Sequence, residues 1–268
     1  MKQITFGNKK ICYHADGNGD AVMLLHGFAE DSRIWNYQAE KLREKFYVII
    51  PDLPGSGASE ILEGEATIEE YAEVIKAITD AEINNNERKT FALIGHSLGG
   101  YISLAFAEKY PELLNSFGLF HSSAFADDEA KKDARKKGIE FIKEIGPASF
   151  LKTTTANLFS GKTKKENNNL IDDLIDLSKN FSAETLIQYY GAMMRRSERI
   201  SVLKSFSKPV LFIIGKEDAA IPLDASLKQC HLPRISTVYI LETSGHMGMW
   251  EQPLKSLDFL LEFLTQSR

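Results

Sequence analysis

The stretch that decides the fold is Ile94-Gly95-His96-Ser97-Leu98-Gly99-Gly100. It matches the pattern G-x-S-x-G and stands between a β-rich run and a helical pattern. In that setting the serine sits on a strained turn from a strand into a helix, and its hydroxyl stands clear of the sheet. Gly95 and Gly99 leave room where side chains would clash, and Gly100 lets the helix pack closely on its neighbours. The sequence therefore predicts that Ser97 is a nucleophile.

The rest of the chain supports an α/β fold around this turn. Short β-rich runs alternate with helical patterns, which is typical of a mostly parallel sheet covered by helices. Thr67-Ile68-Glu69-Glu70 fits a capping box at the start of one helix, and further helices are expected at Leu98–Lys109 and near Pro253–Thr265. We expect an eight-stranded, mostly parallel sheet with helices on both faces. Its strands are predicted at 2–6, 10–14, 21–25, 47–51, 90–94, 116–120, 210–214 and 237–241.

Residues 125–201 interrupt this alternation. The stretch is largely helical in pattern and is too long for a plain connection between two strands. We expect a helical cap at 125–201, inserted into a core formed by residues 1–124 and 202–268. Within it, basic residues alternate with acidic ones, and this mixture predicts a solvated helix face. The basic residues of that run are Lys131, Lys132, Arg135, Lys136 and Lys137.

Two further residues are candidates for activating the serine. A serine hydroxyl is a poor nucleophile until a base takes its proton. His246 lies in a glycine-flanked loop after the last predicted strand, and that loop can carry it to the edge of the sheet. Asp218 directly follows the strand at 210–214 and is predicted to orient His246, with Glu217 as the substitute. The resulting chain order Ser, Asp, His is the order that this kind of site uses.

The tetrahedral intermediate of acyl transfer needs two N–H donors aimed at its oxyanion. The backbone amide of Leu98, directly after the nucleophile, is one candidate, and the Phe28 amide is the other. His26 is then a structural brace for the loop that carries Phe28. Loop residues beside the site suit an apolar acyl group of modest size. The expected pocket residues are His121, Phe125, Ile221 and Met247, although His121 can equally be a histidine with its hydrogen bonds satisfied elsewhere.

These motifs together resemble the α/β-hydrolase fold family, in its capped serine esterase-like form. The resemblance rests on four stretches: His26-Gly27-Phe28, the D-x-x-G-x-G-x-S loop at 52–59, the turn at 95–100, and Gly215–Asp218 with Gly245-His246. It implies the fold, the Ser97-His246-Asp218 triad and hydrolysis of a carboxylic ester or related acyl substrate through an acyl-enzyme. It does not imply a substrate, because this fold hosts many activities. A C–C bond hydrolase, a cofactor-free perhydrolase and a non-catalytic small-ligand receptor remain alternatives.

Composition narrows the class of protein further. The formal charge of −5 and the pI near 5.8 argue against nucleic-acid binding, which needs a basic surface. The first residues have no apolar run typical of a secretory signal, and no stretch is apolar enough to cross a bilayer. Cys12 and Cys230 are far apart and suit two reduced thiols. We expect a cytoplasmic monomer or homodimer that acts on a small acyl substrate without a metal or cofactor.

Overall fold

The computed structural model describes residues 1–83 and 89–267. Its strands form one sheet in the order β1-β2-β4-β3-β5-β6-β7-β8. The pairs that involve β2 are antiparallel, and the pairs from β4 to β8 are parallel. The predicted eight-stranded, mostly parallel sheet is confirmed. The strands are β1 (Lys2–Phe6), β2 (Lys9–Gly17), β3 (Ala21–Leu25), β4 (Tyr47–Pro51), β5 (Phe91–His96), β6 (Leu114–Phe120), β7 (Val210–Gly215) and β8 (Ser236–Leu241).

Helices fill the intervals between the strands. Before β7 they are α1 (Asn36–Leu42), α2 (Ile68–Glu82), α3 (Leu98–Lys109), α4 (Glu129–Ile145), α5 (Pro147–Thr154), α6 (Gly161–Glu166), α7 (Asn169–Ser178), α8 (Ala183–Arg195) and α9 (Ile200–Ser205). After β7 they are α10 (Leu223–Cys230), α11 (Gly248–Glu251) and α12 (Pro253–Gln266). The helix after Ser97 has the predicted bounds, and the predicted capping box of α2 is present, with Thr67 and Glu70 bonded to each other's backbone N–H groups.

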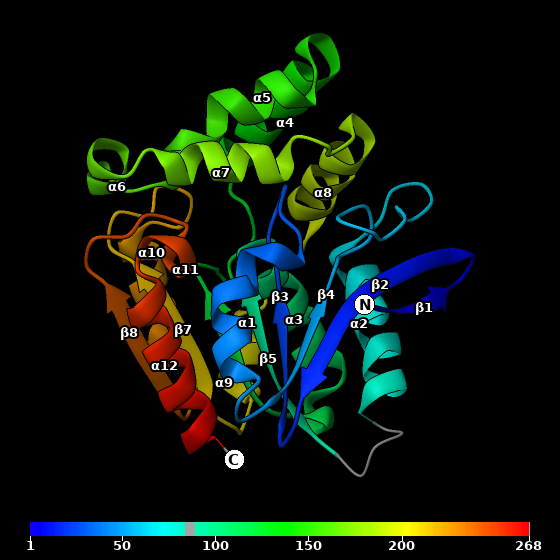
Figure 1. The fold of residues 1–268 in the computed structure, drawn as a ribbon, viewed down its shortest axis with the longest axis vertical. Coiled ribbons are helices and arrows are strands. Elements are labelled where there is room, and N and C mark those ends of the chain that lie inside the picture. Colours follow the sequence, from blue (N-terminus) through cyan, green and yellow to red (C-terminus); the bar gives the residue numbers. More distant parts are fainter. Residues whose placement is uncertain (84–88, 268) are drawn as a thin grey trace.

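The sheet is buried on both faces, as its continuous apolar strands require. In β3, Val22 and Leu24 pack into the core beneath α1 and α12. Met23 and Leu25 point to the opposite face and pack with residues of α2 and α3. The ribbon shows the same three layers, with α1 and α12 on one side of the sheet (Figure 1). This packing fixes the sheet as a rigid base for the loops at the ends of its strands.

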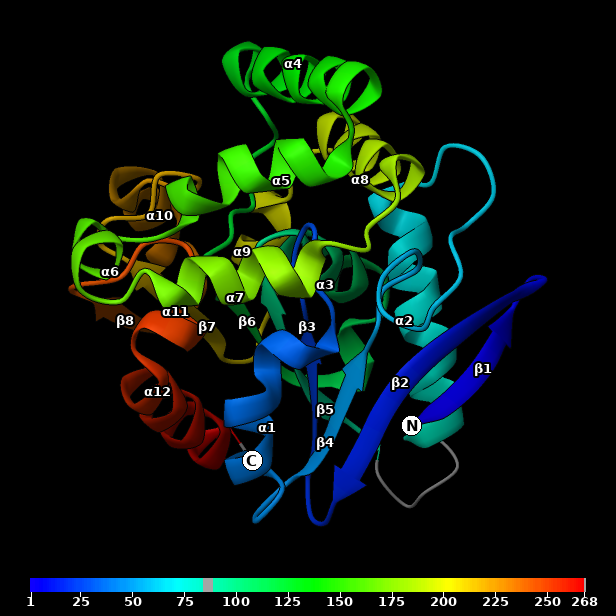
Figure 2. The ribbon, with the colours of Figure 1, turned by 45° about the horizontal axis from the view of Figure 1, so that its top comes forward.

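A group of helices lies across one end of the sheet. Helices α4 to α8 form most of the connection between β6 and β7, and they stand over the strand ends rather than against a face (Figures 1 and 2). The turn after β5, which carries Ser97, reaches the same end of the molecule. In the described ranges, 1–83 and 89–267, no helix is long and apolar enough to cross a membrane.

Candidate active site

Ser97 occupies a strained turn between β5 and α3. Its φ is 50° and its ψ is −114°, a backbone conformation that a residue with a Cβ rarely adopts. Two hydrogen bonds hold the turn: the Ser97 amide donates to the Phe120 carbonyl over 3.0 Å, and the Ser122 hydroxyl donates to the Ser97 carbonyl over 2.7 Å. Strain of this kind is retained where it serves a site. The turn presents Ser97 at the N-terminus of α3.

The glycines of the motif are required by close backbone approaches. A Cβ at Gly99 would lie 2.7 Å from the His26 carbonyl oxygen and 2.8 Å from that of Leu25. A Cβ at Gly95 would collide with the backbone of Gly99. Both glycines therefore leave the space that the sequence predicts. Because a side chain is absent there, the start of α3 packs directly against the loop after β3.

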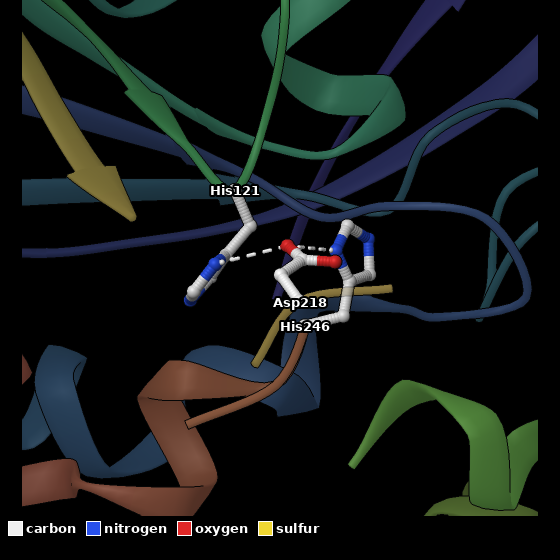
Figure 3. Close-up of side chains that lie close together, drawn as sticks. All are labelled: His121, Asp218 and His246. Atoms are coloured by element: carbon white, nitrogen blue, oxygen red, sulfur yellow. Dashed lines mark hydrogen bonds and ion pairs between the residues drawn. The ribbon is translucent and has the colours of Figure 1, made fainter. Parts of the chain in front are cut away.

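His246 and Asp218 form a buried pair beside this turn. The His246 Nδ1 lies 2.8 Å from Asp218 Oδ2, and both side chains are almost fully buried (Figure 3). Burial alone would lower the pKa of His246, but the charge of Asp218 and its hydrogen bond outweigh burial and raise that pKa above 6.5. Burial likewise opposes the ionisation of Asp218, yet the two histidines around it hold its pKa far below the ordinary value. The pair can therefore supply a neutral imidazole on an ionised carboxylate, ready to accept a proton at Nε2.

The Asp218 carboxylate is fixed on both oxygens. Its Oδ1 accepts from the amides of Ala220 and Ile221, over 2.8 and 2.9 Å. Its Oδ2 faces both His246 and His121. Glu217, the substitute considered from the sequence, instead accepts a hydrogen bond from the Gly161 amide and lies exposed. The structure therefore pairs His246 with Asp218 and not with Glu217.

His121 is a buried neighbour of this pair. Its Nδ1 lies 3.3 Å from Asp218 Oδ2, and the amides of Gly215 and Gly248 point at its two ring nitrogens. A protonated ring has no acceptor for either amide, so these donors oppose protonation. Burial opposes it further and lowers the pKa of His121 to about 4. His121 is thus a neutral histidine packed behind Asp218.

The donor atoms of His121, Asp218 and His246 lie within 4.8 Å of one another, and they are the only such cluster in the part of the chain described here. A metal ion there would compete with the Gly215 or Gly248 amide for a His121 ring nitrogen and would break the bond between His246 and Asp218. Each group is instead satisfied as a member of a hydrogen-bonded network. The arrangement suits proton transfer better than metal binding.

A cavity of about 160 Å³ opens on Ser97 and His246. Helices α4 and α8 supply part of its wall. Of the pocket residues expected from the sequence, Ile221 lines it, whereas His121, Phe125 and Met247 do not. His121 and Met247 are buried behind the site, and the Phe125 carbonyl accepts a hydrogen bond from Arg196. The lining consists of Phe28, Glu30, Ser97, Tyr101, Arg135, Leu158, Tyr190, Met193, Ala220, Ile221 and His246.

The loop after β3 brings two further features to the site. His26 accepts the Leu53 amide at Nε2 over 2.9 Å and contacts the Gly27 carbonyl at Nδ1, so it braces this loop against the loop after β4. The amides of Phe28 and Leu98 make no hydrogen bond to any residue that the structure describes. Both residues flank Ser97, one from the braced loop and one from the first turn of α3.

Glu30 is a site residue that the sequence analysis missed. It is buried, and its Oε2 accepts from the Gly27 amide over 2.6 Å and lies 2.9 Å from His96 Nδ1. The other His96 nitrogen faces the His246 carbonyl over 2.9 Å. Both His96 nitrogens thus meet acceptors. Burial opposes the ionisation of Glu30, but His96 and the Gly27 amide outweigh it and lower the pKa of this carboxyl. The pair ties the Phe28 loop to the His246 loop.

The position of Arg135 differs from the prediction made for the basic run of α4. The basic run of α4 was predicted to be a solvated face, yet Arg135 lines the cavity, and its Nε lies 2.6 Å from Asp127 Oδ2. The signal was present in the spacing: Gly138 and Ile142 are the buried residues of α4, and Arg135 lies three positions before Gly138, on the same helical stripe. The mixture of basic and acidic residues around Arg135 indicated a solvated face, and the spacing was therefore not used.

The whole arrangement can be compared with known proteins. A family model described as serine aminopeptidase, S33, matches residues 18–251, which is most of the chain. The chain belongs to this family of α/β hydrolases. It is an enzyme of the α/β-fold serine hydrolase type, so the receptor alternative is set aside.

Individual members of the wider fold agree with this assignment. A monoacylglycerol lipase of Xenopus laevis is 24% identical, over 99% of this chain and 82% of its own length. A putative carbamate hydrolase of Agrobacterium fabrum is 26% identical, over 93% of this chain and 94% of its own. Among solved structures, a thermophilic esterase from Thermogutta terrifontis in a malate-bound form superposes with a TM-score of 0.92 at 25% identity, covering 100% of this chain and 99% of that one.

Proposed function

We propose that this hydrolase cleaves a carboxylic ester through an acyl-enzyme formed on Ser97. The observation that carries the proposal is the Asp218–His246 pair, which opens on the same cavity as the strained Ser97 turn. The relatives that are called lipase or esterase support the ester as the substrate class. The proposed chemistry needs no metal or cofactor, because the three side chains supply the nucleophile, the base and the charge that stabilises it.

In the first step, Ser97 Oγ attacks the ester carbonyl while His246 Nε2 accepts the hydroxyl proton. Asp218, ionised and fixed by two amides, stabilises the imidazolium that forms. The C–O bond to the alcohol then breaks, and His246 returns the proton to the leaving oxygen. In the second step, His246 takes a proton from water, water attacks the acyl-enzyme, and Ser97 leaves with that proton.

The unpartnered amides of Phe28 and Leu98 are the proposed oxyanion donors. Both belong to segments held rigid by other contacts, one by His26 and Glu30 and one by the helix itself. Donors that are already fixed stabilise a developing oxyanion without reorganisation. We assign to residues 125–201 the part of a cap on a core of 1–124 and 202–268, because Arg135, Tyr190 and Met193 close the cavity over Ser97.

A second, narrower cavity extends the site and suits the acyl group. Its volume is about 100 Å³, and it shares Phe28, Glu30, Leu158 and Tyr190 with the cavity at Ser97. Its remaining lining combines three apolar side chains, Ala29, Leu151 and Leu174, with three that carry hydroxyls, Thr154, Thr155 and Ser178. A short apolar acyl chain fits this extension.

The proposal is tested by hydrolysis of p-nitrophenyl butyrate with the unmodified protein, Ser97→Ala and Ser201→Ala. Ser201 is exposed on α9, so its variant is the matched control. We expect turnover in the unmodified protein and the control, and near-background rates with Ser97→Ala. Equal rates in all three would refute Ser97 as the nucleophile. No turnover in any of them, combined with cleavage of a β-diketone, would favour the C–C hydrolase alternative.

A further inference from the structure

The wall of the active-site cavity carries a positive charge that the ester chemistry does not use. Arg135 lies in a cluster with Asp127 and Arg196, in which one carboxylate meets two guanidinium groups. The Asp127 side chain is fully buried, and that of Arg196 is nearly so. The cluster therefore keeps one surplus positive charge at the wall of the cavity.

The geometry leaves one part of Arg135 available. Its Nε and Nη2 are directed at Asp127, over 2.6 and 3.4 Å, while its Nη1 has no hydrogen-bonding partner in residues 1–83 and 89–267. Arg196 donates from Nη1 to the Met193 carbonyl and from Nη2 to the Phe125 carbonyl, and it stacks on the Tyr101 ring at 3.8 Å. Arg135 is thus the member of the cluster that can still bind a ligand.

Packing holds Arg135 in this position. Gly138, one turn along α4, allows the Tyr190 ring to approach so closely that a Cβ there would lie 2.8 Å from it. The Arg135 guanidinium carbon lies 5.4 Å from the centre of the same ring, and Tyr190 stacks on Phe28 at 4.3 Å. A chain of contacts therefore links Arg135 to the loop that flanks Ser97. The hydroxyls of Tyr101 and Tyr190 also lack hydrogen-bonding partners in the described part of the chain.

We infer that the physiological substrate is an anionic ester, with a carboxylate that binds Arg135 while its ester carbonyl meets Ser97. A singly charged group matches the single surplus charge of the cluster of Arg135, Asp127 and Arg196, whereas a phosphate dianion would exceed it. Glu30, the acidic residue of the lining, accepts from the Gly27 amide and faces His96, and it makes no ion pair with Arg135 in the described residues. This inference rests on the proposed ester hydrolysis and names its substrate class.

Two matched pairs of small esters test the inference. Monomethyl glutarate carries the carboxylate on the acyl side, and butyryloxyacetate carries it on the alcohol side. Each is compared with the neutral ester in which an amide replaces the carboxylate. Calorimetric binding to Ser97→Ala needs no chemistry, and kcat/KM of the serine enzyme is followed by proton release. We expect at least one acid to bind at least about tenfold more tightly than its amide, since hydrogen bonds to charged groups are the stronger ones.

Two substitutions in α4 locate the effect. Arg135→Gln should reduce kcat/KM for the preferred acid by about tenfold or more, and that for its amide by less than about threefold. Lys136→Gln removes the same charge from an exposed neighbour and should change neither. Activity on the amide ester also shows that the variant is folded.

The outcomes separate the two proposals. Equal binding of both acids and their amides would overturn the anionic substrate, and an equal loss on acid and amide with Arg135→Gln would overturn the role of Arg135. If Ser97→Ala binds an acid selectively but the serine enzyme hydrolyses neither ester, the anion site stands and the proposed ester hydrolysis fails.

Discussion

Replacing Asp218 by Asn tests the electrostatics of the site most directly. The change keeps the shape of the side chain but removes the charge that faces His246 at 2.8 Å. Two unit charges about 4 Å apart interact by about 4 kcal/mol at an effective dielectric constant of about 20. Since about 1.36 kcal/mol corresponds to a factor of ten in rate, losing about 4 kcal/mol of stabilisation of the His246 imidazolium corresponds to a factor of about 10³. In the proposed mechanism that imidazolium forms in the transition state, so kcat/KM should fall by about 10³-fold or more.

The same variant has a signature in its pH profile. His246 must be neutral to accept the serine proton, and its pKa is raised above 6.5, so kcat/KM should decline as pH falls through a midpoint above 6.5. In Asp218→Asn, the largest contribution that opposes burial is lost while those of Glu30 and Glu251 remain, so the midpoint of the residual activity should move to lower pH. The assay is kcat/KM for p-nitrophenyl butyrate between about pH 5 and 9, a range that spans the titration of histidine.

Asp224→Asn is the matched control, because Asp224 is exposed in the first turn of α10 and should leave both rate and profile unchanged. An Asp218→Asn enzyme with less than a tenfold loss and an unmoved acid limb would refute the role of this carboxylate.

Three further predictions concern stability. Thr67→Ala should lower the free energy of unfolding by about 1 kcal/mol without changing kcat, measured by urea denaturation, since it removes the cap of α2; an unchanged midpoint would contradict this. Glu30→Gln should cost about 3 kcal/mol at neutral pH, because it breaks the buried pair with His96. Because the pKa of Glu30 is lowered in the folded protein, this carboxylate stabilises the fold at pH values above its pKa in the unfolded chain, and the stabilisation is lost as the pH falls. The free energy of unfolding of Glu30→Gln should therefore decline less in acid than that of the unmodified protein. Gly99→Ala should cost about 1–3 kcal/mol through its clash with backbone oxygens, and full stability would show that the turn can relax.

The fold was largely predictable because its signals are local. The continuous apolar run of β3 and the helix after Ser97 each have the predicted bounds, since burial on both faces and a glycine-rich turn leave direct marks in the sequence. β2 is longer than predicted and ends at Gly17 instead of His14. Its extra residues pair with β4, and Gly17 lies opposite Tyr47. A partner so distant along the chain leaves no local mark.

The residues of the candidate site could be proposed from the sequence only where they lie in a recognisable motif. Ser97, Asp218 and His246 each lie in a loop or turn after a strand, and parallel strands bring such segments to one edge of the sheet. Glu30 and Arg135 have no such motif, because their roles depend on which element packs opposite them. Gly138 lets Tyr190 of α8 approach α4 closely, beside the point where Arg135 faces the cavity. That contact joins residues far apart in the sequence, and the charge pattern around Arg135 indicates solvent instead.

The order of the strands explains why the site forms where it does. β3, β5, β6, β7 and β8 are consecutive neighbours in the sheet, although the site residues beyond them are widely separated along the chain. The backbone ladder continues past the ends of the strands: the His121 amide donates to Ile213 over 2.8 Å, and the Lys216 amide donates to Leu241 over 3.1 Å. The ladder thereby fixes the first residues of the loops that carry the site.

Strain is concentrated at this same edge. In the described part of the chain, the non-glycine residues with positive φ are Ala29, Ser97 and His121, which come after β3, β5 and β6. Such conformations persist only where the surroundings fix them, and here the extended ladder and the packed helices do so. The strands thus hold Ser97 and Asp218, together with His121, which packs behind Asp218. The proposed selectivity for a charged substrate depends instead on Arg135, which lies on α4 between β6 and β7. A change in α4 can therefore alter which ester is cleaved without disturbing the groups that cleave it.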